Sequence, residues 1–235
     1  MSKKYKGKLC VYCGERESTT ADHVWCREFC LEQHRDNLPK VPCCGQCNGE
    51  KARFEHYLTT VLPFGAQHAD SQATLKTLVP KRLEKNARLH RELQIGYVGD
   101  KLPLRDNSVE PLFKYVAKGL VWHHWGTILT PQDCAAAIVV RSDGLGFLGH
   151  LLTKLRPRDR VVGNLGNGAL LYQGIQATDC PQLTMWVLSI YGGLCFGESS
   201  HDPNGKHSII FAITGPRTLL PSFWTSVFNE ELPAA

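Results

Sequence analysis

Cys10-Val-Tyr-Cys13, Thr19-Thr-Ala-Asp-His-Val-Trp25 and Cys44-Gly-Gln-Cys47-Asn-Gly-Glu-Lys51 follow one another in the first quarter of this 235-residue chain. Each C-x-x-C turn holds two thiolates close together, and two such turns supply the four soft ligands of a closed tetrahedral zinc site. We therefore predict a structural zinc ion bound by Cys10, Cys13, Cys44 and Cys47. Cys43 could replace Cys44, but only Cys44 keeps the two-residue spacing to Cys47.

Disulfides or free thiols are the alternative interpretations of these cysteines. No apolar signal segment follows Met1, so we expect a cytoplasmic protein whose thiols are kept reduced. That expectation favours zinc. No run of residues is apolar enough to predict a membrane span. The other cysteines lack comparable spacing and receive no role: Cys26, Cys30, Cys134, Cys180 and Cys195.

The segment between the two cysteine pairs predicts a short β-hairpin followed by a loop. Residues 19–25 favour a strand, whereas residues 37–42 are expected to form a loop because two prolines interrupt regular pairing. From Asn48 to about Leu62, apolar residues recur at helical spacing and predict a helix that begins at the second cysteine pair. Zinc would then clip the hairpin to the start of this helix.

The order C-x-x-C, Asp-His, Asn-Leu and C-x-x-C-Asn-x-x-Lys resembles the HNH endonucleases, whose core is a β-hairpin and a helix around a metal ion. The resemblance covers residues 8 to 62. It implies that Asp22 binds the metal and that His23 is the general base. It also implies that Asn37 supports the loop and that Asn48 completes the metal site. Many members have histidine in place of Asn48, and a neutral amide oxygen favours magnesium or manganese over a catalytic zinc.

The chemistry of these residue types agrees with that implication. Phosphodiester hydrolysis needs a nucleophilic water and stabilisation of negative charge on the phosphate. A neutral His23 can take a proton from water, and a divalent ion held by Asp22 and Asn48 can bind the scissile phosphate. Two protein ligands leave open coordination positions. A buried structural histidine beside an N-capping aspartate is the alternative for His23.

Further along the same helix, Lys51 is a candidate contact to the phosphate backbone and His56 a candidate contact to substrate. Ordinary exposed helix side chains are the alternative for both. Asn48 and Glu55 lie about 10 Å apart along the helix axis, too far to bind one ion together. Residues 71–93 predict a helix or helix pair interrupted near Pro80, with a basic face that could follow phosphates or simply be solvated.

The second half predicts a helix and then strands. Residues 110–125 form an amphipathic pattern that ends at Gly126. The adjacent His123 and His124 point in different directions on a helix, so packing is expected there and not metal binding. A helix over residues 144–155 is a further prediction. Four β-favouring runs follow, separated by glycine-rich turns: Val161–Val162, Ala169–Gln173, Leu183–Leu194 and Ser208–Thr214.

The expected fold class is α+β. We predict a zinc-stapled ββα-metal nuclease domain over residues 1–64, a basic helical connector over 65–105 and an α+β accessory or recognition domain over 106–235, with mainly antiparallel strands. The expected function is a magnesium- or manganese-dependent endonuclease acting on double-stranded DNA. By family analogy such an enzyme serves phage defence, restriction or a mobile element, and its C-terminal region could bind a regulatory protein. A non-cleaving zinc-ribbon module and an RNA endonuclease are the alternatives.

Overall fold

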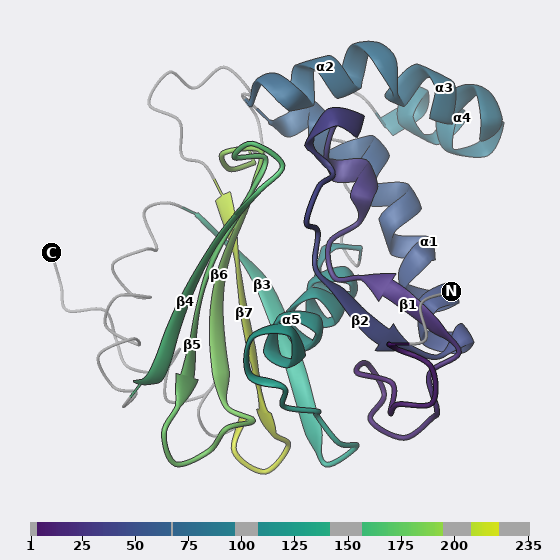
Figure 1. The fold of residues 1–235 in the computed structure, drawn as a ribbon. Helices are drawn as coiled ribbons and strands as arrows, with labels where there is room; N and C mark the ends of the chain where they lie inside the picture. The colour runs from purple at the N-terminus through teal and green to yellow at the C-terminus, as the bar shows by residue number, and fades with distance from the viewer. Residues whose placement is uncertain (1–3, 67, 97–107, 142–156, 195–207, 221–235) are drawn as a thin grey trace, which may run out of the picture.

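A computed structural model describes residues 4–66, 68–96, 108–141, 157–194 and 208–220 (Figure 1). The chain has the expected α+β composition, with one small sheet and one large antiparallel sheet. The small sheet pairs β1 (Thr20–His23) with β2 (Lys40–Cys43). The large sheet has the order β3-β7-β6-β5-β4. Its strands are β3 (Asp133–Arg141), β4 (Pro157–Leu165), β5 (Leu170–Ala177), β6 (Thr184–Ile190) and β7 (Ser208–Pro216).

The hairpin is confirmed, but its second strand lies where a loop was predicted. β2 includes Pro42, which pairs with Ala21 of β1. Proline is tolerated here because the strand belongs to a two-stranded sheet and need not donate a hydrogen bond on both sides. The Pro42 carbonyl still accepts a hydrogen bond, 3.1 Å from the Val11 nitrogen. The prolines therefore shape the edge of the hairpin without preventing it.

Helix α1 (Gly45–Val61) is present as predicted, but it begins within the second cysteine pair, three residues before the expected start at Asn48. Short 3-10 turns precede and follow this unit: η1 (Arg27–Phe29), η2 (Glu32–His34) and η3 (Leu62–Gly65). Three short helices come next: α2 (Ala69–Thr77), α3 (Val79–Lys85) and α4 (Ala87–Gly96). Pro80 lies in the first turn of α3, where a missing N–H costs nothing, so the interruption falls at Leu78, just before it.

Helix α5 (Val109–Trp125) ends as predicted at Gly126, whose φ of 67° is the left-handed conformation of a helix terminus. All four predicted strands are present, whereas β3 was not anticipated. The glycine-rich residues 163–168 end β4 and make the turn into β5. The predicted helix over residues 144–155 lies outside the described residues.

Helix α5 lies between the hairpin and the large sheet and packs on both (Figure 1). Trp25, which follows β1, stacks against Tyr172 of β5 at 6.2 Å and meets Phe113 of α5 edge-on at 6.3 Å. Gly119 allows Val24 to approach, since a Cβ there would stand 2.9 Å from the valine methyl groups. One buried cluster thus joins segments from all three predicted regions of the chain. Among the described helices, none combines the length and apolarity that crossing a bilayer requires.

Candidate functional site

Four cysteines form a compact cluster where the N-terminal loop meets α1. The sulfur atoms of Cys10, Cys13, Cys44 and Cys47 all lie within 4.8 Å of one another. Cys44 is the N-cap of α1 and Cys47 lies in its first turn. Four cysteine sulfurs at this spacing fit a closed tetrahedral zinc site. Cys43 is buried beside them but does not belong to the cluster, as the spacing predicted.

The surroundings of the cluster suit a bound cation with thiolate ligands. Burial raises the pKa of Cys47, whereas hydrogen bonds, the strongest of them from Cys43, lower the pKa of Cys10 to about 4. A bound zinc ion would hold all four sulfurs as thiolates. Arg16 adds a second positive charge, because its guanidinium donates to the sulfurs of Cys44 at 3.3 Å and Cys47 at 3.4 Å. These residues therefore fit a structural zinc.

Asp22 and His23 are neighbours on β1, so their side chains leave opposite faces of the strand. Asp22 turns toward α1, where its Oδ2 accepts hydrogen bonds from the Tyr12 hydroxyl at 2.6 Å and the Lys51 ammonium at 2.7 Å. The carboxylate is thus held from two sides. This network separates the aspartate from the histidine that follows it.

Lys51 does not reach the surface, contrary to its predicted contact with a phosphate backbone. Its side chain is fully buried, and its ammonium donates to Asp22, to the His23 carbonyl at 2.6 Å and to Glu55 at 2.6 Å. Burial by itself would lower the pKa of Lys51, but the two carboxylates outweigh burial and raise it. Lys51 therefore ties α1 to the end of β1 as a permanent charge.

Replacing Lys51 with methionine is expected to lower the free energy of unfolding by about 3 kcal/mol, since Asp22 and Glu55 would lose their shared cation in a largely buried setting. Urea denaturation of both proteins measures the difference. Lys76→Met, at an exposed position on α2, is the matched control and should shift stability little. Equal stability of Lys51→Met and the parent would show that the three charges do not hold this region together.

The His23 side chain lies on the other face of β1, where it is partly buried and close to positively charged side chains. Its Nδ1 is buried and has no hydrogen-bond partner within the described residues. Burial, followed by the positive charges of Lys40 and Arg27, lowers the pKa of His23 to about 4. The imidazole is therefore neutral at physiological pH, the state in which a histidine can accept a proton.

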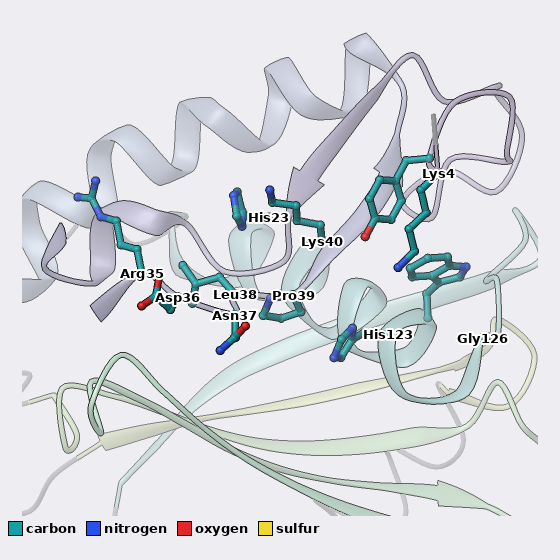
Figure 2. A pocket seen from close by; sticks show the side chains of 12 residues that line it. Lys4, His23, Arg35, Asp36, Asn37, Leu38, Pro39, Lys40, His123 and Gly126 are labelled. Carbon is teal, nitrogen blue, oxygen red and sulfur yellow. The ribbon is translucent and has the colours of Figure 1, made fainter. Parts of the chain in front are cut away.

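His23 opens onto a cavity of about 760 Å³ between the hairpin and the end of α5 (Figure 2). Three of the side chains around it are basic (Lys4, Arg35 and Lys40) and one, Asp36, is acidic. The full lining comprises Lys4, Tyr5, His23, Arg35, Asp36, Asn37, Leu38, Pro39, Lys40, Trp122, His123 and Gly126. The cavity therefore offers a net positive, histidine-containing surface to an anionic ligand.

The other predicted site residues divide between the cavity and α1. Asn37 lines the cavity, and its φ of 59° is a left-handed conformation that asparagine tolerates in the turn entering β2. Asn48 is half-buried in the first turns of α1, one turn before Lys51, and is not among the cavity residues. His56 is exposed near the middle of α1 beside Asn86, with 3.2 Å between Nε2 and the amide nitrogen, and it also lies away from the cavity.

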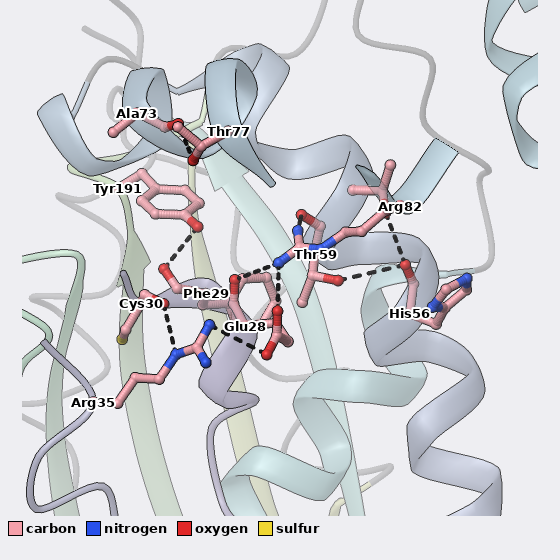
Figure 3. A network of polar contacts seen from close by, with 11 residues as sticks. Glu28, Phe29, Cys30, Arg35, His56, Thr59, Ala73, Thr77, Arg82 and Tyr191 are labelled. Atoms are coloured by element: carbon pink, nitrogen blue, oxygen red, sulfur yellow. Dashed lines mark hydrogen bonds and ion pairs between the residues drawn. The ribbon is translucent and has the colours of Figure 1, made fainter. Parts of the chain in front are cut away.

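Arg35 is a cavity residue that the sequence did not single out. Figure 3 shows Arg35 and Arg82 converging on Glu28. Arg35 pairs with Glu28 at 3.2 Å and donates to the Cys30 carbonyl at 3.1 Å, while Arg82 holds the second carboxylate oxygen at 2.8 Å. The Tyr191 hydroxyl, from beyond β6, donates to the Phe29 carbonyl at 2.7 Å. Contacts between residues far apart in the sequence therefore fix the Arg35 guanidinium at the cavity wall. No local sequence pattern predicts such contacts.

Tyr5, Trp122 and His123 also line the cavity unexpectedly. Tyr5 and Trp122 are in ring contact, with centroids 6.4 Å apart. The adjacent histidines 123 and 124 predict packing, because neighbouring helix residues point in different directions. That interpretation suits His124, which bonds the Tyr172 hydroxyl at 3.1 Å, whereas His123 is exposed to the cavity.

Comparisons of this chain with protein-family models, with curated proteins and with solved structures give no match.

Proposed function

We propose that this protein is an HNH-type, metal-dependent endonuclease that hydrolyses phosphodiester bonds in nucleic acid. One observation carries the proposal. A neutral His23, at the end of a strand fastened to a helix by four cysteines, opens onto a cavity that bears Arg35, Lys40 and Lys4. Basic side chains attract the phosphate, and a neutral imidazole beside them can take the proton of an attacking water.

The α1 side of the hairpin has donors that fit a hard divalent cation. Within the described residues, both hydrogen bonds to the Asp22 side chain are accepted by Oδ2, so Oδ1 can bind a metal ion. Asn48 offers an amide oxygen one turn before Lys51. Asp22 and Glu55 both pair with Lys51, and burial raises the pKa of Glu55. Magnesium or manganese prefers such oxygen ligands. A bound ion would neutralise charge on a phosphate that reaches the α1 face of β1, the face opposite the His23 cavity. Asp22 and Asn48 would hold the ion, and Asn37 would support the loop beside His23.

The ion pair between Lys51 and Asp22 also favours a second candidate, a zinc-stapled module that binds nucleic acid or a protein without cutting it. In that case Asp22 serves only as a structural partner of Lys51, and the positive cavity serves binding alone. The two candidates make opposite predictions about turnover.

Incubation of the purified full chain with supercoiled duplex DNA, single-stranded DNA and RNA tests the proposal. We expect cleavage in magnesium or manganese, and we expect Asn48→Ala to raise the metal concentration required for half-maximal cleavage at least about tenfold, because a ligand of the ion is lost. Gln46→Ala, at an exposed position in the same turn of α1, is the matched control. Cleavage with no metal dependence, or no cleavage of any substrate, would favour the binding module.

Family analogy points to double-stranded DNA, and the single-stranded DNA and RNA arms of this experiment distinguish the other nucleic-acid substrates. A role in phage defence, restriction or a mobile element, and control by a protein bound to the C-terminal region, belong to the same proposal. Each follows from family analogy.

A further inference from the structure

The cavity beside His23 has two chemically different ends. Arg35 and Asp36 lie at one end, His23 and Lys40 lie toward the middle, and Lys4 lies at the other end, with His123 below (Figure 2). The first end belongs to the loop before β2. The second is built by the N-terminal arm and the last turn of α5, which contributes Trp122 and His123.

The α5 end offers ring surfaces on which a base can stack. Lys4 lies at the same end, so positive charge is present there as well. Trp122 lies in the last turn of α5, and its carbonyl is already the acceptor for the Gly126 N–H. Tyr5 and Trp122, both half-buried, offer ring surfaces there. Exposed aromatic side chains beside basic ones are the elements with which proteins stack unpaired bases.

The opposite part of the cavity suits phosphates. Arg35 is fixed by Glu28 and the Cys30 carbonyl, and Lys40 is exposed at the start of β2, opposite His23. Lys8 adds positive charge near the aromatic end, with its ammonium 5.9 Å from the Trp122 ring centroid. A base could therefore lie against α5 while its flanking phosphates meet the hairpin.

We propose that this cavity binds one unpaired nucleotide, so that the protein prefers single-stranded nucleic acid to a continuous duplex. The inference rests on the proposed function and deepens it by naming the substrate class. A volume of about 760 Å³ lies in the range of sites that enclose a small organic group. A base inside a duplex must first leave its stack, at an energetic cost that an unpaired base avoids. Trp122 and Tyr5 would stack the base, and Lys40 and Arg35 would bind the phosphates.

Fluorescence anisotropy with a labelled oligothymidine and with a duplex of equal length tests this inference in the full chain carrying His23→Ala, which prevents cutting. We expect the single strand to bind at least tenfold more tightly than the duplex. Adding Trp122→Ala should weaken single-strand binding about five- to a hundredfold, the range measured for loss of one stacking partner. Trp122→Phe should keep most of the affinity. Lys114→Ala, a partly exposed position on α5 outside the cavity, should change nothing.

Equal affinity for both oligonucleotides, or affinity unchanged by Trp122→Ala, would overturn the inference. Circular dichroism establishes that each variant is folded, and Tyr5→Ala repeats the test on the N-terminal arm if Trp122→Ala unfolds. The binding measurement tests the nucleotide site, and the cleavage assay tests the nuclease proposal. Trp122-dependent single-strand binding without cleavage by the parent would sink the nuclease proposal and keep this site. If Trp122→Ala cleaves duplex DNA at the parental rate, the nuclease proposal stands and the nucleotide site is wrong.

Discussion

Replacing Cys44 with serine is expected to abolish zinc binding and to unfold the hairpin and the first turns of α1. The sulfur of Cys44 is one of the four that could bind zinc, and the position of Cys44 as the helix N-cap makes it part of the start of α1 as well. Structural zinc sites contribute about 10–16 kcal/mol of apparent binding free energy, comparable with the whole stability of a domain at about 5–15 kcal/mol. The measured zinc content should fall from about one ion per chain to none. Amide hydrogen exchange over residues 10–51 should become faster.

Two other cysteines provide controls for this experiment. Cys43→Ala removes a buried sulfur immediately beside the cluster. Cys134→Ser removes a partly buried sulfur from β3. Both variants should retain zinc, because neither sulfur belongs to the cluster. A Cys44→Ser protein with a full complement of zinc, or a parent protein purified without any metal, would contradict the assignment.

Replacing His23 with alanine is expected to reduce the cleavage rate by about 10²- to 10⁴-fold, the usual contribution of a general base. The imidazole lies on the cavity wall with its pKa lowered to about 4 by burial and by Lys40 and Arg27. It is therefore unprotonated in the neutral range, and the same lowering of the pKa makes it a weaker base than a free histidine. Single-turnover cleavage with saturating magnesium or manganese measures the change directly.

The matched control for this variant is His90→Ala, since His90 is an exposed histidine on α4 away from the cavity. His23→Ala must also retain zinc and its melting temperature, so that lost activity cannot reflect lost structure. If a folded His23→Ala protein cuts at the parental rate, His23 is not the general base and the proposed mechanism is wrong.

The elements that were predicted correctly are those with local causes. The hairpin strand at residues 20–23, helices α1 and α5 and four strands of the large sheet follow from hydrophobic periodicity, capping residues and turn glycines. The choice of Cys44 over Cys43 came from spacing on a single turn. The prolines predict a loop over residues 37–42, whereas the structure has the strand β2 there, because an edge strand tolerates proline.

By itself, the sequence determined the four cysteines that cluster, the hairpin and helix beside them, and the location of the Asp22-His23 pair, because each depends on residues close together along the chain. The tertiary structure alone decided the buried position of Lys51 and the cavity assembled from residues 4–5, 23, 35–40, 122–123 and 126. The reason is physical. Burial of a charge and enclosure of a cavity depend on which distant segments pack together, and here α5 brings Trp122 and His123 to a hairpin about a hundred residues away.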